Sequence, residues 1–172
     1  KKNLQDDPIV KERIRQETYR GLIERELGKK ISEIKVTDAE MQAYYKKSPE
    51  LRTSHILIEF RPDANADQKK AAKDRANEIL AEVSKGKRSF EEYVGLYTDD
   101  ILSKKTGGDV GWQTALTLVP AYYQAVLAMK MNEVKGLIET QYGFHIIKKT
   151  GQRPYAEANK RTIRAAVFDE KR

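Results

Sequence analysis

The chain has 172 residues and no cysteine, and its 33 Lys and Arg exceed its 26 Asp and Glu, giving a formal net charge of +7. Its mean hydropathy is -0.74. The absence of cysteine excludes disulfides, cysteine-ligated zinc and thiol nucleophiles. The longest apolar runs, such as 56–58 and 126–129, are far shorter than the roughly 20 residues that a membrane-spanning helix needs. The composition therefore predicts a soluble globular protein.

The positive charge is spread along the whole chain. Residues 1–50 carry 12 basic and 10 acidic side chains, residues 51–150 carry 15 and 13, and residues 151–172 carry 6 and 3. A nucleic-acid-binding surface concentrates Lys and Arg on one element. We therefore expect no nucleic-acid partner, while a weak attraction to acidic clients or to anionic membrane surfaces stays open.

Both ends of the chain predict helices. Apolar residues recur at helical spacing from Asp7 to about Lys30, and the capping-box sequence Thr37 to Glu40 begins a second, short helix that ends before Pro49. A third helix is expected from Tyr155 onward. Because each helix has an apolar stripe to bury, we predict that the two ends pack together into one helical module.

The middle of the chain mixes strands and helices. In chain order the pattern predicts a strand at 53–60, a helix at 67–84 capped by Asp67, a helix at 89–97, a tight glycine turn at 106–112, a helix beginning near Pro120, and strands at 133–140 and 144–149. The order is summarised as β-α-α-α-β-β. This is typical of a compact α+β domain of about 100 residues.

The only two histidines, His55 and His145, lie within predicted strands. Period-2 alternation puts each on one face of its strand, so the imidazoles meet if the strands are neighbours with matched faces. Asp100 or Asp109 could add a third metal ligand, but no metal-binding spacing is present, and we expect no metal. A nucleophile elbow and a phosphate-binding loop are also absent.

Five motifs in order resemble the parvulin-type peptidyl-prolyl isomerases over residues 51–151. They are Ser54-His55-Ile56-Leu57-Ile58, Tyr97-Thr98-Asp99-Asp100, Gly107-Gly108-Asp109-Val110-Gly111-Trp112, Val119-Pro120-Ala121-Tyr122 and Tyr142-Gly143-Phe144-His145-Ile146-Ile147. The flanking helices resemble the split chaperone domain of exported foldases of the SurA and PrsA type. The resemblance implies a four-stranded, mainly antiparallel sheet.

The resemblance also implies the site residues. His55 and His145 match the histidine pair on the floor of the parvulin active site, which shares hydrogen bonds with a threonine that matches Thr140. Asp100 falls on the position near the substrate carbonyl that is Cys or Asp in the family. The substrate-binding residues are expected to be Val110, Leu118, Tyr122 and Trp112, of which Trp112 also anchors the glycine turn. The long basic loop of phospho-specific parvulins is missing, so we expect no phosphoserine requirement.

From this resemblance we predict a peptidyl-prolyl cis–trans isomerase and folding chaperone for exported proteins. It is expected to act without a cofactor and without covalent chemistry on X-Pro bonds of unfolded or proline-containing polypeptides. The domains are expected at 1–50 (helical), 51–151 (parvulin-like) and 152–172 (a helix that packs with the N-terminal segment). The resemblance implies a periplasmic or cell-envelope location, with any signal sequence outside this chain. Peripheral membrane association and a homodimer through the helical module are left open.

Three questions remain open at this point: the protonation state of Asp100, the role of the histidines and whether the protein is an active enzyme. An ionised Asp100 would repel the substrate carbonyl, whereas a protonated one would donate a hydrogen bond to it. The histidines are expected to hold the site together rather than to transfer protons. A catalytically weak or inactive holdase that binds unfolded polypeptide is the competing function.

Overall fold

The structure is a computed structural model that describes residues 7–172. The described residues form two compact units, one containing residues 7–44 together with Asn159–Arg172, and the other Tyr45–Ala158. The second unit is somewhat wider than the segment 51–151 expected from the sequence. None of the helices within residues 7–172 is both long enough and apolar enough to cross a membrane.

The described part of the first unit contains three helices. They are α1 (Pro8–Ser32), α2 (Asp38–Lys47), which runs into the second unit, and α7 (Lys160–Lys171). The Thr37 capping box is confirmed, since the Glu40 carboxylate accepts from Thr37 N at 2.8 Å and Thr37 Oγ1 accepts from Glu40 N at 3.3 Å. Ile163, Ala166 and Val167 of α7 are buried. Lys171 donates to both Glu40 Oε1 and the Lys35 carbonyl at 2.6 Å, which joins α7 to the segment around α2.

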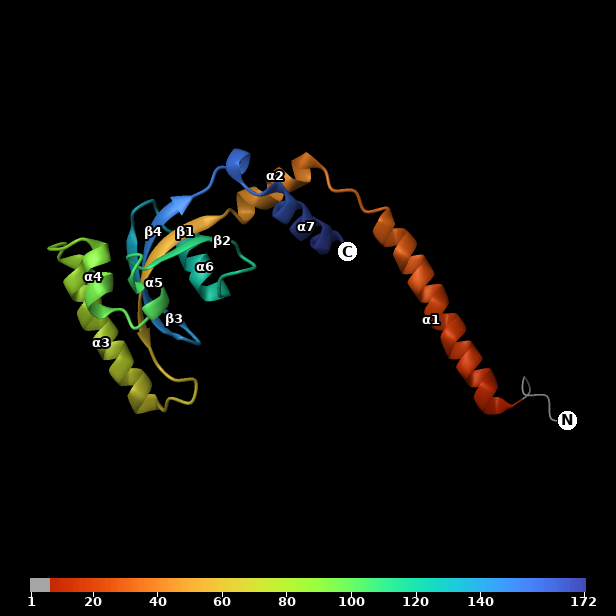
Figure 1. Cartoon of the computed structure of the whole chain (residues 1–172), viewed down its shortest axis with the longest axis horizontal. Helices are drawn as coiled ribbons and strands as arrows, with labels where there is room; N and C mark the ends of the chain where they lie inside the picture. The colour runs from red at the N-terminus through yellow and green to blue at the C-terminus, as the bar shows by residue number, and fades with distance from the viewer. Residues whose placement is uncertain (1–6) are drawn as a thin grey trace. The chain divides into compact units, whose positions relative to one another are not determined.

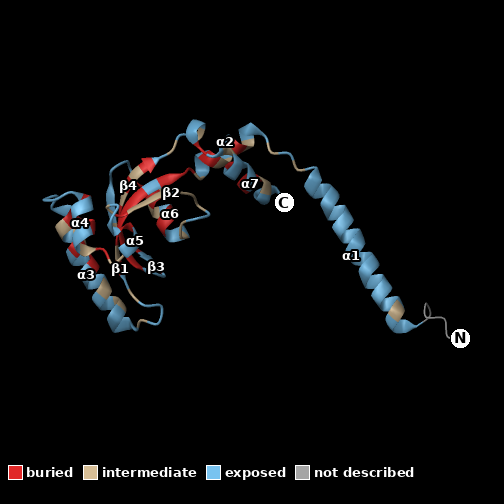
Figure 2. Cartoon of the chain, viewed as in Figure 1, coloured by how far each residue is buried: buried red, intermediate tan, exposed pale blue. Residues whose placement is uncertain are grey.

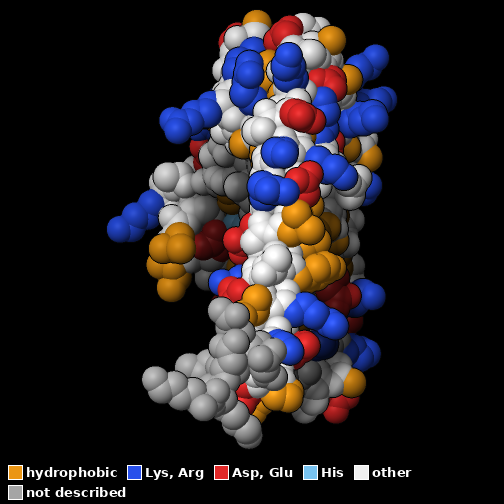
Figure 3. All heavy atoms as spheres, turned by 90° about the vertical axis from the view of Figure 1, so that its right-hand side faces the viewer, with side chains coloured by type: hydrophobic (Ala, Val, Ile, Leu, Met, Phe, Trp, Pro, Cys, Tyr) orange, Lys and Arg blue, Asp and Glu red, His pale blue; other side chains and the backbone are white. Residues whose placement is uncertain are grey.

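Helix α1 differs from the sequence expectation. It begins at the Asp7 cap and reaches Ser32, but none of its residues is buried. Its apolar side chains lie exposed between charged ones (Figures 2 and 3). The prediction that all three helical stripes are buried together therefore fails for α1, because no other described element covers its apolar side chains.

The second unit is built on one antiparallel sheet with the strand order β2-β1-β4-β3 (Figure 1). Its elements are β1 (Leu51–Glu59), α3 (Ala66–Ser84), α4 (Phe90–Tyr97), α5 (Ile101–Lys104), β2 (Asp109–Gln113), α6 (Pro120–Leu127), β3 (Val134–Thr140), β4 (Gly143–Gln152) and a 3₁₀ turn, η2 (Tyr155–Glu157). The α+β class and the four-stranded antiparallel sheet are confirmed.

Two details of the predicted order are corrected. The glycine-rich segment predicted as a tight turn is a turn only up to Gly108, after which Asp109–Gln113 forms β2, and a short helix, α5, precedes the turn. The order is therefore β-α-α-α-β-α-β-β. Periodicity misses β2 because the positive φ of Gly111, +72°, interrupts the alternation of side chains. The cap of α3 is Asn65, in a capping box with Gln68, and not Asp67.

The sheet separates two cores. Helices α3 and α4 cover one face, where Ile56 and Ile58 of β1 meet Phe144 and Ile146 of β4. Helix α6 covers the other face through a cluster of buried side chains: Leu51, Tyr122, Tyr123, Val126, Met129, Ile138 and Ile147. Between residues 53–59 of β1 and 143–149 of β4 the pairing is regular, so the odd-numbered positions of these two stretches point toward α6. The two histidines occupy such positions.

Candidate active site

The two imidazoles meet across the β1–β4 pair. His55 lies opposite Ile147 and His145 lies opposite Leu57, so the histidines are diagonal neighbours on the α6 face of the sheet. Their Nδ1 atoms are 3.2 Å apart and both side chains are buried. The alternation in the sequence therefore predicts this juxtaposition correctly.

Asp100 extends the pair at the His55 end. Its Oδ2 lies 2.8 Å from His55 Nε2 and accepts a hydrogen bond from Ser103 Oγ, while Oδ1 accepts from Leu102 N at 3.0 Å. Burial alone would raise the pKa of Asp100, but the hydrogen bonds from Ser103 and His55 outweigh burial and leave that pKa below its usual value. Asp100 is therefore an ionised carboxylate near neutral pH.

Thr140 closes the chain of hydrogen bonds at the other end. Its Oγ1 lies 2.7 Å from His145 Nε2 and accepts from Tyr142 N at 3.2 Å. Burial and the neighbouring His55 lower the pKa of His145 to about 3, so this ring is neutral. The structure thus brings together all four residues expected at the catalytic centre: His55, Asp100, Thr140 and His145.

The ionised carboxylate gives this chain a direction when both rings are neutral. A carboxylate can only accept, so His55 Nε2 carries a proton and His55 Nδ1 accepts from His145 Nδ1. His145 Nε2 then accepts from the Thr140 hydroxyl, which accepts in turn from the backbone of Tyr142. Each side-chain nitrogen and oxygen in this series of hydrogen bonds has a partner. The series is therefore satisfied without any proton moving along it.

A pocket of about 210 Å³ opens beside the histidines. It is lined by His55, Val110, Thr117, Leu118, Val119, Tyr122, Thr140, Tyr142 and His145. Three of the four expected substrate-binding residues, Val110, Leu118 and Tyr122, are among these. Their side chains supply an apolar wall facing a polar floor, the arrangement found in small-molecule and peptide sites.

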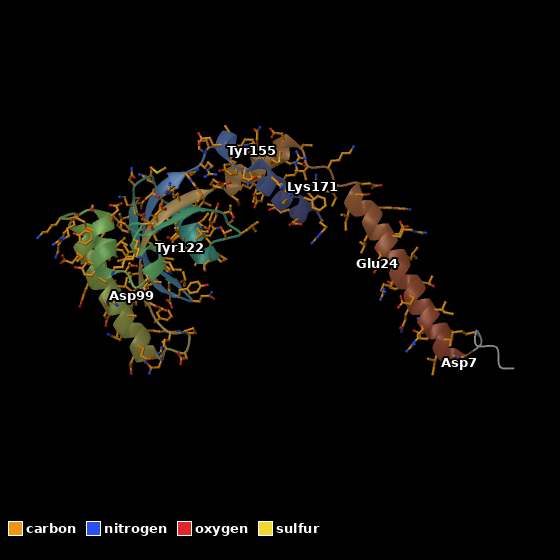
Figure 4. All side chains as sticks on the ribbon, viewed as in Figure 1. Asp7, Glu24, Asp99, Tyr122, Tyr155 and Lys171 are labelled. Atoms are coloured by element: carbon orange, nitrogen blue, oxygen red, sulfur yellow. The ribbon has the colours of Figure 1, made fainter. Side chains whose placement is uncertain are left out.

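Tyr122 connects this wall to the floor. It projects from α6 (Figure 4), and its ring meets His145 edge-on, with centroids 5.3 Å apart and an interplanar angle of 88°. Its hydroxyl lies 2.9 Å from Thr53 Oγ1. Burial raises the pKa of Tyr122, so the phenol stays neutral and serves as a fixed aromatic surface.

The fourth expected residue, Trp112, does not line the pocket. Its ring lies 4.5 Å from the guanidinium carbon of Arg153, and a Cβ on Gly151 would come within 2.8 Å of it. The positive φ of Gly111 breaks the alternation that would otherwise put residues 110 and 112 on the same face. Trp112 therefore lies outside the lining of this pocket, and its expected role in substrate binding stays a prediction.

Several contributors to the site were not expected as such. Thr98 is buried, and its Oγ1 accepts from both Leu57 N and Asp100 N, which fixes the loop before Asp100. Ser103, three residues after Asp100, donates to the carboxylate. The spacings Thr-x-Asp and Asp-x-x-Ser suit such local hydrogen bonds and could have indicated both residues. Tyr142, which lines the pocket, lies in the fifth motif but was not among the expected site residues.

Gly108 brings β2 and the glycine turn against this site. Its φ is +81°, its carbonyl accepts from His55 N at 3.0 Å, and a Cβ there would come 2.4 Å from the His55 carbonyl oxygen. Only glycine allows this approach.

Comparison with known families agrees with this geometry. Residues 55–151, which include every residue of the hydrogen-bond chain, match the rotamase family described as the PPIC-type PPIASE domain. The chain belongs to this family. The PPIC-type domain therefore contains the paired histidines, Asp100 and the apolar wall.

The relatives of this PPIC-type chain include bacterial foldases. It is 35% identical over 148 residues to foldase protein PrsA 1 of Bacillus cereus, covering 84% of this chain and 46% of the relative. It is 32% identical to foldase protein PrsA of Caldanaerobacter subterraneus, covering 95% and 50%. The chain thus spans about half the length of these relatives.

A solved structure agrees as well. The crystal structure of the peptidylprolyl isomerase PrsA from Bacillus anthracis superposes with a TM-score of 0.56 at 30% identity, covering 79% of this chain and 57% of that one. The parvulin-type resemblance with PrsA character is therefore confirmed.

Proposed function

We propose that this protein catalyses cis–trans isomerisation of X-Pro bonds in unfolded polypeptides and thereby assists their folding. The observation that supports this most strongly is the apolar wall of Val110, Leu118 and Tyr122 beside a buried chain of hydrogen bonds that ends in an ionised carboxylate. The amide barrier is about 18–20 kcal/mol and arises from resonance, so catalysis needs a site that favours the twisted amide over both planar forms.

The apolar wall is proposed to hold the prolyl ring while the preceding carbonyl turns. A planar amide places negative charge on its carbonyl oxygen, and twisting reduces that charge. The Asp100 carboxylate beside this oxygen would disfavour the planar forms more than the twisted one. Both of its oxygens already accept hydrogen bonds from the protein, so it keeps its charge and position throughout.

The histidines are proposed to hold the site together. His55 donates to Asp100 and His145 donates to His55, and both rings lie on rigid strands. No bond of the substrate is broken, so the proposed reaction requires no nucleophile and no proton transfer.

The test is prolyl exchange in a short X-Pro peptide, followed by NMR exchange spectroscopy and by a protease-coupled assay. We expect exchange well above the uncatalysed rate, a large loss in Leu118→Ala and Asp100→Asn, and no loss in Glu59→Gln, an exposed change at the end of β1. Exchange at the background rate together with preserved peptide binding would instead support the holdase function. That alternative draws on the exposed apolar side chains of α1, such as Ile14 and Leu27.

The clients and the location are also proposals. We propose unfolded, proline-containing polypeptides as clients, because the relatives are named foldases. The resemblance to exported foldases supports a cell-envelope location. Cell fractionation of the tagged full-length protein tests the location, and crosslinking to unfolded chains tests the clients.

A further inference from the structure

Two apolar side chains next to the site are almost fully exposed. Ile101 and Leu102 on α5 have exposed fractions of 78% and 91%. Within residues 7–172 no other large apolar side chain is as exposed as these two. They form what we call the α5 pair.

The α5 pair is held in place rather than carried on a loose loop. Asp100 caps α5 by accepting from Leu102 N at 3.0 Å, and Ser103, on the same turn, is buried. The Ser103 carbonyl accepts from Gly108 N at 2.8 Å, which ties α5 to the glycine turn before β2. An apolar surface on an anchored segment loses little conformational entropy when a ligand covers it.

The α5 pair also follows the site directly along the chain. Ile101 directly follows Asp100, whose carboxylate contacts His55 at the floor of the pocket. If the carbonyl of residue X turns beside Asp100, the Cα that carries the side chain of residue X is bonded directly to that carbonyl carbon. Residue X therefore lies near the beginning of α5 while proline occupies the pocket.

We propose that Ile101 and Leu102 form the subsite for the residue that precedes proline, and that this subsite selects apolar side chains over acidic ones. This inference rests on the proposed function, because it takes the pocket as the prolyl site. The occupant is the apolar residue X of an unfolded polypeptide.

Charge favours the same choice. The Asp100 carboxylate is ionised and borders the α5 pair, so an acidic or phosphorylated residue X would meet a like charge there. An apolar residue X would instead cover Ile101 and Leu102, and removing their surface from water is favourable. Exposed apolar surface next to a binding pocket commonly marks a place where a ligand docks.

The experiment compares peptides that differ only at X, with Leu, Ala, Lys or Glu before proline. For the wild-type protein we expect kcat/KM to be about tenfold higher for Leu than for Glu, with Ala between them. In the double variant Ile101→Ser, Leu102→Ser, we expect the preference for Leu over Ala to fall by about threefold, while kcat/KM for the Ala peptide changes by less than about twofold.

The matched control is Met131→Ser. Met131 is also an exposed apolar residue, with an exposed fraction of 51%, but it lies in the connection between α6 and β3. This variant should keep the full preference for Leu. Thermal unfolding of each variant checks the fold, and because both side chains of the α5 pair are exposed, we expect no large loss of stability.

Three results would overturn the proposal. The first is a wild-type preference for Glu over Leu before proline. The second is an equal loss of kcat/KM with every residue X in the double variant, and the third is an unchanged preference for Leu over Ala in that variant. Leu116→Ser serves as a further comparison, since Leu116 adjoins the pocket-lining Thr117 and is 72% exposed. A shift in preference with Leu116→Ser alone would assign the subsite to that loop and contradict the α5 pair.

Binding of the same peptides is measured in parallel by NMR titration. If the protein binds but does not catalyse, the proposed isomerase function fails, while the order of affinities still tests the α5 pair. If it catalyses without preference at X, the function stands and the subsite fails.

Discussion

The Nδ1 atoms of His55 and His145 lie 3.2 Å apart, and each ring uses its other nitrogen for a different partner, Asp100 for His55 and Thr140 for His145. The two rings are also stacked, with an interplanar angle of 27°. The histidines of the β1–β4 pair thus join Thr140 at the end of β3 to the Asp100 carboxylate before α5 through a continuous chain of hydrogen bonds. Disturbing any member leaves a buried neighbour without its partner.

The first prediction concerns His55→Phe, which keeps a flat ring of similar size. His145 Nδ1 and the Asp100 carboxylate lose a hydrogen bond, so we expect the free energy of unfolding to fall by about 1–3 kcal/mol. Prolyl exchange should slow in parallel, because Asp100 loses the donor that positions it. Urea unfolding and NMR exchange on the same sample measure both effects, with Glu59→Gln as the control. A variant that is inactive yet as stable as the wild type would contradict a purely supporting role for His55.

The second prediction concerns acid stability. The unfolded chain binds a proton at His145 below the ordinary pKa of 6.5, whereas the folded protein does so only near pH 3. Between these pH values the unfolded state binds more protons than the folded state. Lowering the pH therefore decreases the free energy of unfolding, by on the order of 1 kcal/mol per pH unit. Asp100 acts in the same direction at lower pH, because its pKa in the folded protein is below the ordinary value of 3.8.

Urea unfolding at pH 7, 6, 5 and 4 measures this slope. His145→Phe should have a shallower slope between pH 6.5 and 4, since it removes the group that titrates differently in the two states. The matched comparison is the exposed change Glu59→Gln, which should keep the wild-type slope in this range. Equal slopes in the wild type and His145→Phe would show that His145 is not the origin of the acid lability.

Much of this site could be predicted from the sequence because it depends on local rules. Period-2 alternation places His55 and His145 on one face, and antiparallel pairing then brings them together. The capping box of Thr37 also lies where the sequence predicts it. These features need only neighbouring residues, or one strand pair, to be recognised.

The rest depends on backbone geometry and on contacts between distant segments. The positive φ of Gly111 conceals β2 and turns Trp112 toward Arg153. Likewise, the ionised state of Asp100 follows from the hydrogen bonds of Ser103 and His55, which sequence alone does not reveal. The exposure of α1 could not be predicted either, because an amphipathic pattern indicates a face that can be buried but not whether a partner covers it.

The third prediction uses two glycines with similar backbone conformations. Gly108 and Gly111 have φ values of +81° and +72°, but a Cβ at Gly108 would meet the His55 carbonyl oxygen at 2.4 Å, whereas a Cβ at Gly111 has nothing within 4 Å. We expect Gly111→Ala to lower the free energy of unfolding by about 1–2 kcal/mol, from backbone strain alone. Gly108→Ala should cost about 1–3 kcal/mol more, because β1 or the turn must move.

Urea unfolding of the two variants measures the difference, and chemical shifts of the histidine rings report whether the site has moved. Because the two changes share the same backbone penalty, the difference isolates the close approach to His55. Equal losses of stability would contradict the account of Gly108 as a spacing residue for β1.

The last prediction separates the ring of Tyr122 from its hydroxyl. The ring lines the pocket and meets His145 edge-on, whereas the hydroxyl points to Thr53, whose side chain is fully buried. Tyr122→Phe should therefore leave prolyl exchange within about twofold of the wild type and cost about 1 kcal/mol of stability, because Thr53 loses its partner. Tyr122→Ala removes the aromatic ring that lines the pocket. It should lower the free energy of unfolding by about 3–5 kcal/mol and raise KM for every X-Pro peptide. If Tyr122→Phe stays stable but loses exchange, the hydroxyl acts on the substrate, and the neutral, fixed aromatic surface inferred for Tyr122 is wrong.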